Sequence, residues 1–252
     1  MPTLTRRGFL LSAAALTASC AGRGRVSSPP AEAAATVRRP EIGESWSYAK
    51  RALGSGAVDT EINRVSAVGR MIAVESHLES NQYAPNRYPS WGSAWLDKYM
   101  VRGAAAGPLP GEVQEPWGMI LVDPHWGQIQ AYEEPIPLWP AELRPDWSIT
   151  VGTRYKTLES NDALPWQLTI HTHGWESVTV PAGQFKALRY TNIIDFRYTN
   201  VSGRDAAQRI EHLWFAPEIG RWVIRESSGS FYQDVGEEFR ETAYRWELLR
   251  WT

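Results

Sequence analysis

The stretch LRYTNIIDFRY, residues 188–198, alternates apolar and polar side chains over most of its length. Successive side chains of an extended chain point to opposite sides, so the two kinds of residue fall on opposite faces. The apolar face carries Leu188, Tyr190, Ile194, Phe196 and Tyr198, and the polar face carries Arg189, Thr191, Asp195 and Arg197. This period of two predicts a β-strand with one buried and one solvated face.

The same period governs much of the remaining chain. We expect further strands at residues 71–75, 117–122, 128–132, 147–152, 166–171, 210–215, 222–225 and 244–249. Gly, Pro and Ser punctuate the chain between them at residues 181–183, 202–203, 217–220 and 228–229, which is turn chemistry. We therefore predict a mainly β fold with little helix: an antiparallel meander forming a strongly curved sheet, a half-barrel or an open barrel.

The chain divides into three segments. We expect residues 1–19 to form a signal peptide, residues 20–40 a lipid-attachment site and disordered tether, and residues 41–252 a β-rich envelope domain. Two layouts of this domain are open: one sheet, or two similar halves joined near residues 135–145, where prolines stiffen the chain. Residues 81–111 are expected to form an irregular insertion with one short helix, acting as a lid or as a plain surface loop.

The N-terminal residues resemble an export signal followed by a lipid-attachment site. Thr5–Leu10, with the pair Arg6 and Arg7, resembles the twin-arginine export signal, and the apolar segment after it is shorter than the roughly 20 residues of a membrane-spanning helix. Leu16–Cys20 resembles a lipobox, which implies acylation of Cys20. We expect an exported, lipid-anchored protein on the periplasm-facing outer membrane. Ordinary signal cleavage would instead give a soluble periplasmic protein.

Charge and cysteine content restrict the function. The chain has 26 Lys and Arg against 28 Asp and Glu, and removal of a signal containing Arg6 and Arg7 leaves 24 against 28, a net charge of −4. This mild acidity argues against nucleic acid as a partner, because phosphate binding requires concentrated positive charge. Cys20 is the single cysteine, so the folded part has no disulfide and no thiol nucleophile.

Two motifs in the C-terminal half carry a resemblance. VPAGQFKA at residues 180–187 and WFAPEIG at residues 214–220 resemble successive hairpins of uncharacterised bacterial periplasmic proteins and lipoproteins, V-P-A-G-x-F-x-A followed by W-[YF]-A-P-x-[VI]-G. The resemblance implies a β-rich envelope domain without a family catalytic site. The motif residues are those that a tight turn needs, and Gly183 supplies a backbone angle that other residues avoid.

Few residues suggest chemistry. His171 and His173 share one face of a strand and are weak metal candidates if His212 or Glu211 supplies a third ligand, but a solvated polar strand is the simpler interpretation. The adjacent carboxylates Glu133–Glu134 and Glu237–Glu238 point to opposite sides of a strand and cannot work as a pair. We predict no catalytic residue and no cofactor, and no metal site beyond the weak candidates.

Thirteen tryptophans are the compositional oddity, and most are expected in the core. Our leading hypothesis is a non-enzymatic envelope lipoprotein that meets the membrane through its lipid and binds an amphiphilic or hydrophobic ligand, or an envelope protein. A structural or interaction module that binds polysaccharide through exposed tryptophans is the first alternative. An enzyme with a site not visible in sequence is the second.

Overall fold

The computed structural model describes residues 35–79, 112–123, 130–157, 160–197, 206–232 and 238–252. These residues belong to one compact unit, Ala34–Thr252. The export signal with Arg6 and Arg7, the candidate lipid site Cys20 and the expected insertion at 81–111 lie outside the described residues. No helix in the described ranges combines the length and the hydropathy that a membrane crossing needs.

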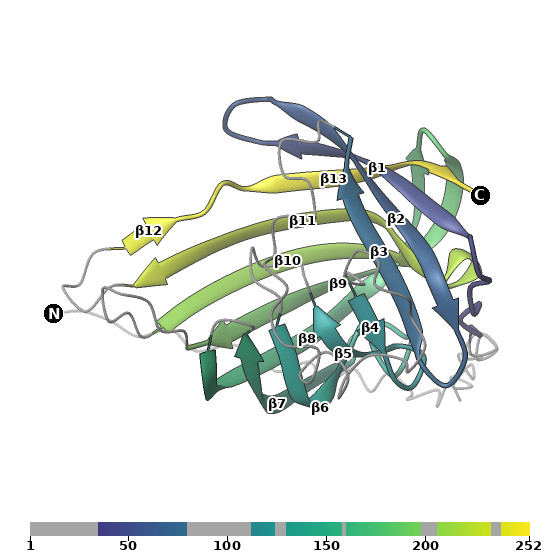
Figure 1. The fold of residues 1–252 in the computed structure, drawn as a ribbon. Coiled ribbons are helices and arrows are strands. Elements are labelled where there is room, and N and C mark those ends of the chain that lie inside the picture. Colours follow the sequence, from purple (N-terminus) through teal and green to yellow (C-terminus); the bar gives the residue numbers. More distant parts are fainter. Residues whose placement is uncertain (1–34, 80–111, 124–129, 158–159, 198–205, 233–237) are drawn as a thin grey trace, which may run out of the picture. The chain divides into compact units, whose positions relative to one another are not determined.

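The described chain is almost entirely β-strand, which confirms the predicted fold class (Figure 1). The strands are β1 (Ser45–Ala52), β2 (Val58–Val68), β3 (Ile72–Leu78), β4 (Glu112–Gln114), β5 (Met119–Asp123), β6 (Gln130–Pro137), β7 (Ser148–Thr157), β8 (Ser160–Val180), β9 (Gly183–Phe196), β10 (Ala206–Ala216), β11 (Arg221–Tyr232), β12 (Glu238–Arg240) and β13 (Tyr244–Trp251). A single turn of 3₁₀ helix, η2 (Pro217–Ile219), joins β10 to β11.

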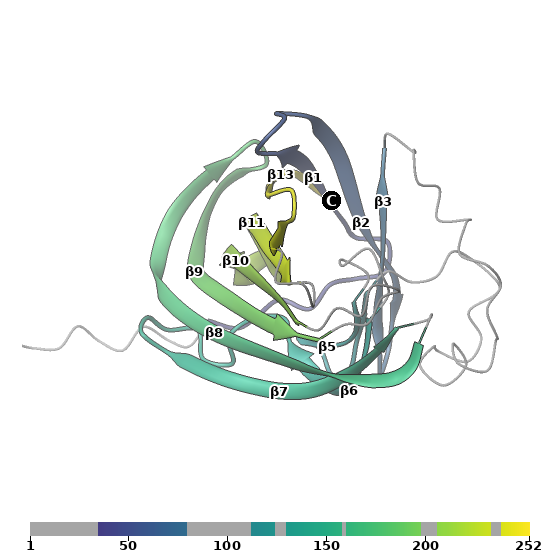
Figure 2. The same ribbon diagram turned by 90° about the vertical axis from the view of Figure 1, so that its left-hand side faces the viewer.

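The strands form a ring. From β1 to β11 each strand pairs antiparallel with the next one in the chain. The last strand, β13, pairs with β11 on one side and with β1 on the other, and this closes the meander. The short strand β12 pairs with β11 alone, so twelve of the thirteen strands make up a closed barrel. Figure 2 shows the long strands β7, β8 and β9 curving around one side of it.

Turn residues set the two motif hairpins. Between β8 and β9 the chain reverses at Pro181–Ala182, and Gly183 has φ 135°, which a residue with a side chain rarely adopts. After η2, Gly220 has φ 62°, and a Cβ there would lie 2.3 Å from the carbonyl oxygen of Arg38. Both glycines are therefore required by the backbone, as the sequence predicts for Gly183.

The residues before β1 are part of the packed unit. Val37 packs against the core, and the Arg38 backbone N–H donates to the Pro217 carbonyl at 2.8 Å. The Arg38 side chain also pairs with Glu44 at 2.5 Å. Residues 37–40, which the composition assigns to the tether, thus contact the barrel, because Val37 supplies apolar area and Arg38 finds partners on two sides.

Residues 135–145 belong to the end of β6 and to the segment that leads from β6 to β7. Pro135 to Pro137 complete β6, and β6 pairs directly with β7 through Gln130, Ala131 and Tyr132. Beyond β6, the Leu138 N–H donates to the Gly118 carbonyl at 2.8 Å. The proline-rich segment therefore continues one sheet instead of spanning a gap between separate sheets.

The core lies inside the ring and is rich in aromatic side chains. Trp46, Tyr48, Tyr132, Trp166 and Trp222 are each at most 2% exposed. Of the ten tryptophans that the structure describes, none is fully exposed. Burial of large aromatic rings supplies much of the apolar area that stabilises a fold without a disulfide.

Candidate functional site

The barrel interior contains a small cavity that opens to solvent. Its described lining comes from β4 to β6, from β8 to β11 and from Leu138. The apolar lining is Ile120, Ile136, Pro137, Leu138, Trp166, Leu168, Ile194, Leu213 and Trp222, and the polar lining is Glu112, Asp123, Asn192, Glu211 and Arg225. The centres of water-sized groups can occupy about 40 Å³, room for about three such groups. The cavity is therefore small and has walls of two kinds.

One buried ion pair contributes its carboxylate, Glu112, to the polar lining. The Arg221 guanidinium donates to both carboxylate oxygens of Glu112, at 2.7 and 2.9 Å, and both side chains are 1% exposed. The Gln114 amide also donates to Glu112, at 2.6 Å. Burial alone would lower the pKa of Arg221, but the attraction and hydrogen bonds of Glu112 raise it, so the guanidinium stays charged.

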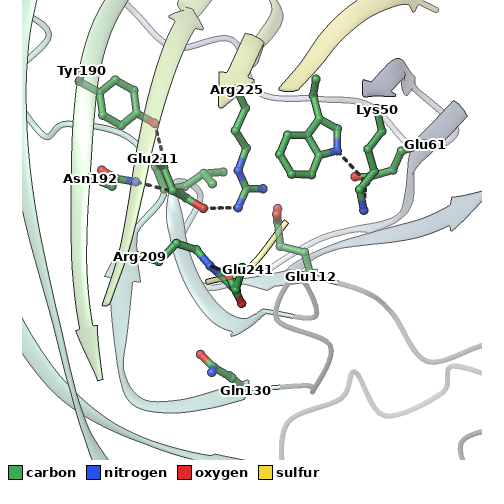
Figure 3. Close-up of polar contacts among 12 residues, drawn as sticks. Lys50, Glu61, Glu112, Gln130, Tyr190, Asn192, Arg209, Glu211, Arg225 and Glu241 are labelled. Atoms are coloured by element: carbon green, nitrogen blue, oxygen red, sulfur yellow. Dashed lines mark hydrogen bonds and ion pairs between the residues drawn. The ribbon is translucent and has the colours of Figure 1, made fainter. Parts of the chain in front are cut away.

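A second buried pair lies beside the first. Arg225 Nη2 donates to Glu211 Oε1 at 2.5 Å, and the Asn192 amide nitrogen approaches Glu211 Oε2 at 3.5 Å (Figure 3). Burial lowers the pKa of Arg225, and the charge and hydrogen bond of Glu211 outweigh it and raise the pKa. Arg225 therefore remains a cation inside the barrel.

Two further pairs continue the polar interior. Arg209 binds Glu241 with two nitrogens, one of them Nε at 2.8 Å. Lys50 Nζ lies 3.7 Å from Glu61 Oε2, and the Trp246 indole N–H donates to the same oxygen at 2.9 Å. Figure 3 shows these side chains converging from different strands on the inside of the ring. Four ion pairs of the described residues thus place charged side chains inside a barrel whose core is rich in aromatic residues.

Three polar atoms of the cavity lining have no hydrogen-bond partner in the structure. They are Asn192 Oδ1, Trp166 Nε1 and Arg225 Nε. The residues that carry them are 7%, 2% and 7% exposed. A buried polar atom without a partner costs free energy, so such atoms call for water or a ligand group. By contrast, the Tyr190 hydroxyl has a partner, because it donates to the Leu138 carbonyl at 2.9 Å. Burial raises the pKa of this hydroxyl, so it keeps its proton.

The histidines lie elsewhere, away from the cavity lining. The His171 and His173 rings are in edge contact, with centroids 5.0 Å apart, and Thr191 Oγ1 links His173 Nε2 at 2.7 Å to His212 Nδ1 at 3.0 Å. The described residues contain no group of three or more His, Cys, Asp or Glu side chains able to hold a metal. The three imidazoles, two of which share the Thr191 hydroxyl, form a polar surface cluster.

Glu211 corrects an expectation. The sequence offers Glu211 as a third ligand beside His171 and His173. In the structure Glu211 is 4% exposed and binds Arg225, whereas Asp195 is exposed and accepts from Gln208 at 2.9 Å. The reason is the alternation of β10, which turns Glu211 inward and its neighbour His212 outward.

The adjacent carboxylates Glu133 and Glu134 are both exposed. Glu133 lies 3.9 Å from Arg154, and the Glu134 backbone N–H donates to Thr153. The side chain of Glu238 lies outside the residues whose burial is described, as does all of Glu237. Glu133 and Glu134 are therefore surface residues and do not line the cavity.

Sequence reasoning missed the residues that form the polar wall. Glu112 lies outside every predicted strand, and Asn192 interrupts the apolar positions of the stretch at 188–198. One signal was present, because Arg225 ends the apolar run Trp222–Ile224, where a charge must find a buried partner. The partner itself could not be found without the ring.

Comparisons with known proteins identify no family and include two solved structures of low similarity. No family model matches the sequence, and no curated protein matches it. A solved structure of a "putative lipoprotein" from Parabacteroides distasonis is similar, with a TM-score of 0.47 and 11% identity over 86% of this chain and 99% of that chain. Another, a "putative exported protein with YmcC-like fold" from Bacteroides fragilis, has a TM-score of 0.38 and 12% identity over the same shares. With scores and identities this low, neither likeness bears on function.

Proposed function

We propose that this protein is a non-enzymatic, lipid-anchored envelope protein whose barrel binds an amphiphilic ligand in the interior cavity. The observation that carries the proposal is the double character of the lining. Trp166, Leu168 and Leu213 offer apolar side chains, and the same lining includes Asn192 and Arg225, each of which carries an unsatisfied polar atom. Ligand sites combine apolar surface with a few placed polar groups in this way.

The size of the cavity limits what enters it. Room for about three water-sized groups suits one end of an amphiphile and not a whole acyl chain. A longer ligand would extend from the opening of the cavity. Binding at the end of a tether is consistent with the lipobox resemblance at Cys20, which would hold the barrel at a membrane that contains amphiphiles.

The non-enzymatic part of the proposal rests on two of the three cavity carboxylates. Glu112 is held by both terminal nitrogens of Arg221, and Glu211 by Arg225. Carboxylates fixed in this way are positioned as ion-pair partners and not as proton carriers. The polysaccharide alternative has less support, because none of the ten described tryptophans presents a fully exposed face.

Lipid anchoring has a direct test. Intact-mass measurement of the chain purified from membranes should give the processed protein starting at Cys20 plus two or three acyl groups. A Cys20→Ser variant should lack that mass and leave the membrane fraction. An unmodified mass for the native chain would contradict the anchor.

Ligand binding is tested with the exported Cys20→Ser chain, which can be purified without detergent. Three probes of equal chain length, 1-octanol, octanoate and octylammonium, are titrated while the fluorescence of the cavity tryptophans is recorded. We expect at least one probe to bind. In Ile194→Phe, which fills the cavity, that binding should weaken at least about tenfold, because overpacking leaves no room.

The matched control is Ile193→Phe, the same change on the neighbouring residue, which does not line the cavity and points to the other face of β9. It should bind like the parent chain. Circular dichroism and thermal unfolding establish that both variants fold. The proposal fails if no octyl probe binds the parent chain, or if Ile194→Phe binds as well as Ile193→Phe.

A further inference from the structure

We infer that the polar groups of the cavity lining select a neutral group that both donates and accepts hydrogen bonds, such as the hydroxyl of an alcohol or polyol, over a carboxylate or an ammonium group. This inference rests on the proposed function, since it names the chemical class of the ligand for the same cavity. It is carried by the kinds of unsatisfied atoms there and by the charges around them.

The unsatisfied atoms require a ligand group that can both donate and accept a hydrogen bond. Trp166 Nε1 and Arg225 Nε are donors and require an acceptor, whereas Asn192 Oδ1 is an acceptor and requires a donor. A hydroxyl group provides one donor and two acceptor lone pairs. A carboxylate lacks the donor, and an ammonium group lacks the acceptor.

The orientation of Asn192 follows from its neighbour. Its amide nitrogen faces the Glu211 carboxylate at 3.5 Å. Exchange of the amide nitrogen and oxygen would place the amide oxygen against a carboxylate oxygen, which is repulsive. Glu211 therefore fixes Asn192 Oδ1 as the atom that remains unsatisfied.

The charges of the lining disfavour an anionic ligand. Glu112, Asp123 and Glu211 contribute three carboxylates to the wall, and Arg225 contributes one guanidinium. Arg225 is already engaged with Glu211, and Arg221, which pairs with Glu112, does not line the cavity. A further carboxylate or phosphate would add a fourth anion to this lining and would leave Asn192 Oδ1 without a donor, while a cation would approach Arg225 and leave two donors unsatisfied.

The same three octyl probes test this inference. At pH 7 the Cys20→Ser chain should bind 1-octanol at least about tenfold more tightly than octanoate or octylammonium, since each charged probe leaves a buried polar atom unpaired. Equal or tighter binding of octanoate or octylammonium would overturn the inference and leave the proposed function standing. Absence of binding by all three would instead overturn the proposed function.

A fourth probe isolates the donor. Heptyl methyl ether has the same number of heavy atoms as 1-octanol and accepts a hydrogen bond but cannot donate one. The parent chain should prefer octanol to the ether about fivefold, the value of one ordinary hydrogen bond. Asn192→Leu should abolish that preference. The matched control Gln167→Leu, an exposed amide outside the cavity lining on β8, should keep it.

Each outcome of the comparison between octanol and the ether supports or overturns the inference. If octanol and the ether bind equally to the parent chain, Asn192 Oδ1 is satisfied by water and the inference is wrong. If the parent chain prefers octanol to the ether and Asn192→Leu keeps that preference, another group accepts the hydrogen bond from the hydroxyl. The assignment to Asn192 is then wrong. If Asn192→Leu does not fold, the two ratios measured on the parent chain still settle the class of ligand.

Discussion

The inside of the barrel and its outer surface both carry an arginine–glutamate pair, and the two pairs differ in almost everything except distance. Arg221 and Glu112 are 1% exposed and 2.7 Å apart, and Arg144 and Glu142 are 58% and 56% exposed and 2.6 Å apart. The inner partners are 109 residues apart in the chain, and the outer partners are two apart. Proximity of charges therefore says little about their importance, because burial decides what their separation would cost.

The difference follows from the solvent. Removal of one partner from the inner pair leaves an uncompensated charge in a dry environment, whereas water replaces the lost partner on the surface. The hydrogen bond from Arg144 lowers the pKa of Glu142, but the group is fully exposed and the effect is screened by water and salt. The inner pair ties β4 to the beginning of β11, and the outer pair ties nothing distant together.

The largest effect is expected from breaking the inner pair. Arg221→Met leaves the Glu112 carboxylate buried beside the Gln114 amide without its guanidinium partner and should lower the free energy of unfolding by about 3–5 kcal/mol. Urea denaturation followed by tryptophan fluorescence measures it. The double variant Arg221→Met with Glu112→Leu should recover much of the loss, because no lone charge remains. A loss below about 1 kcal/mol in the single variant would show that the inner pair is no more important than a surface pair.

The matched change on the surface should have almost no effect. Arg144→Ala removes the partner of Glu142, but both side chains are largely hydrated in the folded protein. We expect the urea midpoint to equal that of the parent chain within error, at low and at high salt. A measurable loss would mean that Arg144 holds something other than Glu142 in place.

The smallest effect concerns pH and the outer histidine cluster. Burial lowers the pKa of His173 below its ordinary value of 6.5, and His171, Arg189 and His212 lower it further, whereas Glu176 opposes them. The folded protein thus disfavours the proton more than the unfolded chain does. The contribution of His173 is fully present above about pH 6.5 and is lost as the pH falls below that value toward the lowered pKa.

Unfolding measured at pH 7.5 and pH 5.5 checks this prediction. The parent chain should lose a small amount of stability over this interval, and His173→Gln should lose less. The inner pairs should contribute nothing to the difference through their arginines, since Arg221 and Arg225 have raised pKa values and remain charged. An identical pH dependence in both proteins would remove His173 as the cause.

Local strand structure was predictable from the sequence. The stretch at 188–198 became most of β9, with Leu188, Tyr190, Ile194 and Phe196 buried as predicted. Thr191 is also buried, at 9% exposed, because His173 and His212 both contact its hydroxyl. The period of two succeeded here because each face of this strand meets a single environment over most of its length.

The same rule failed where the interior is polar. Strand β4 has two polar residues, Glu112 and Gln114, facing the inside, so an apolar–polar pattern assigns it to no strand. Alternation reports which residues share a face, but composition alone cannot tell which face is inside when ion pairs occupy the core.

The sequence by itself determined the class of structure, the direction of the chain at its hairpins and the glycine that the β8–β9 turn requires, because these depend on residues close together in the chain. Tertiary structure decided the closure of β13 onto β1 and the meeting of Glu112 with Arg221 and of Asn192 with Glu211. Those contacts depend on the register of strands around a ring, which no local pattern encodes. The cavity and its polar lining exist only once that register is set.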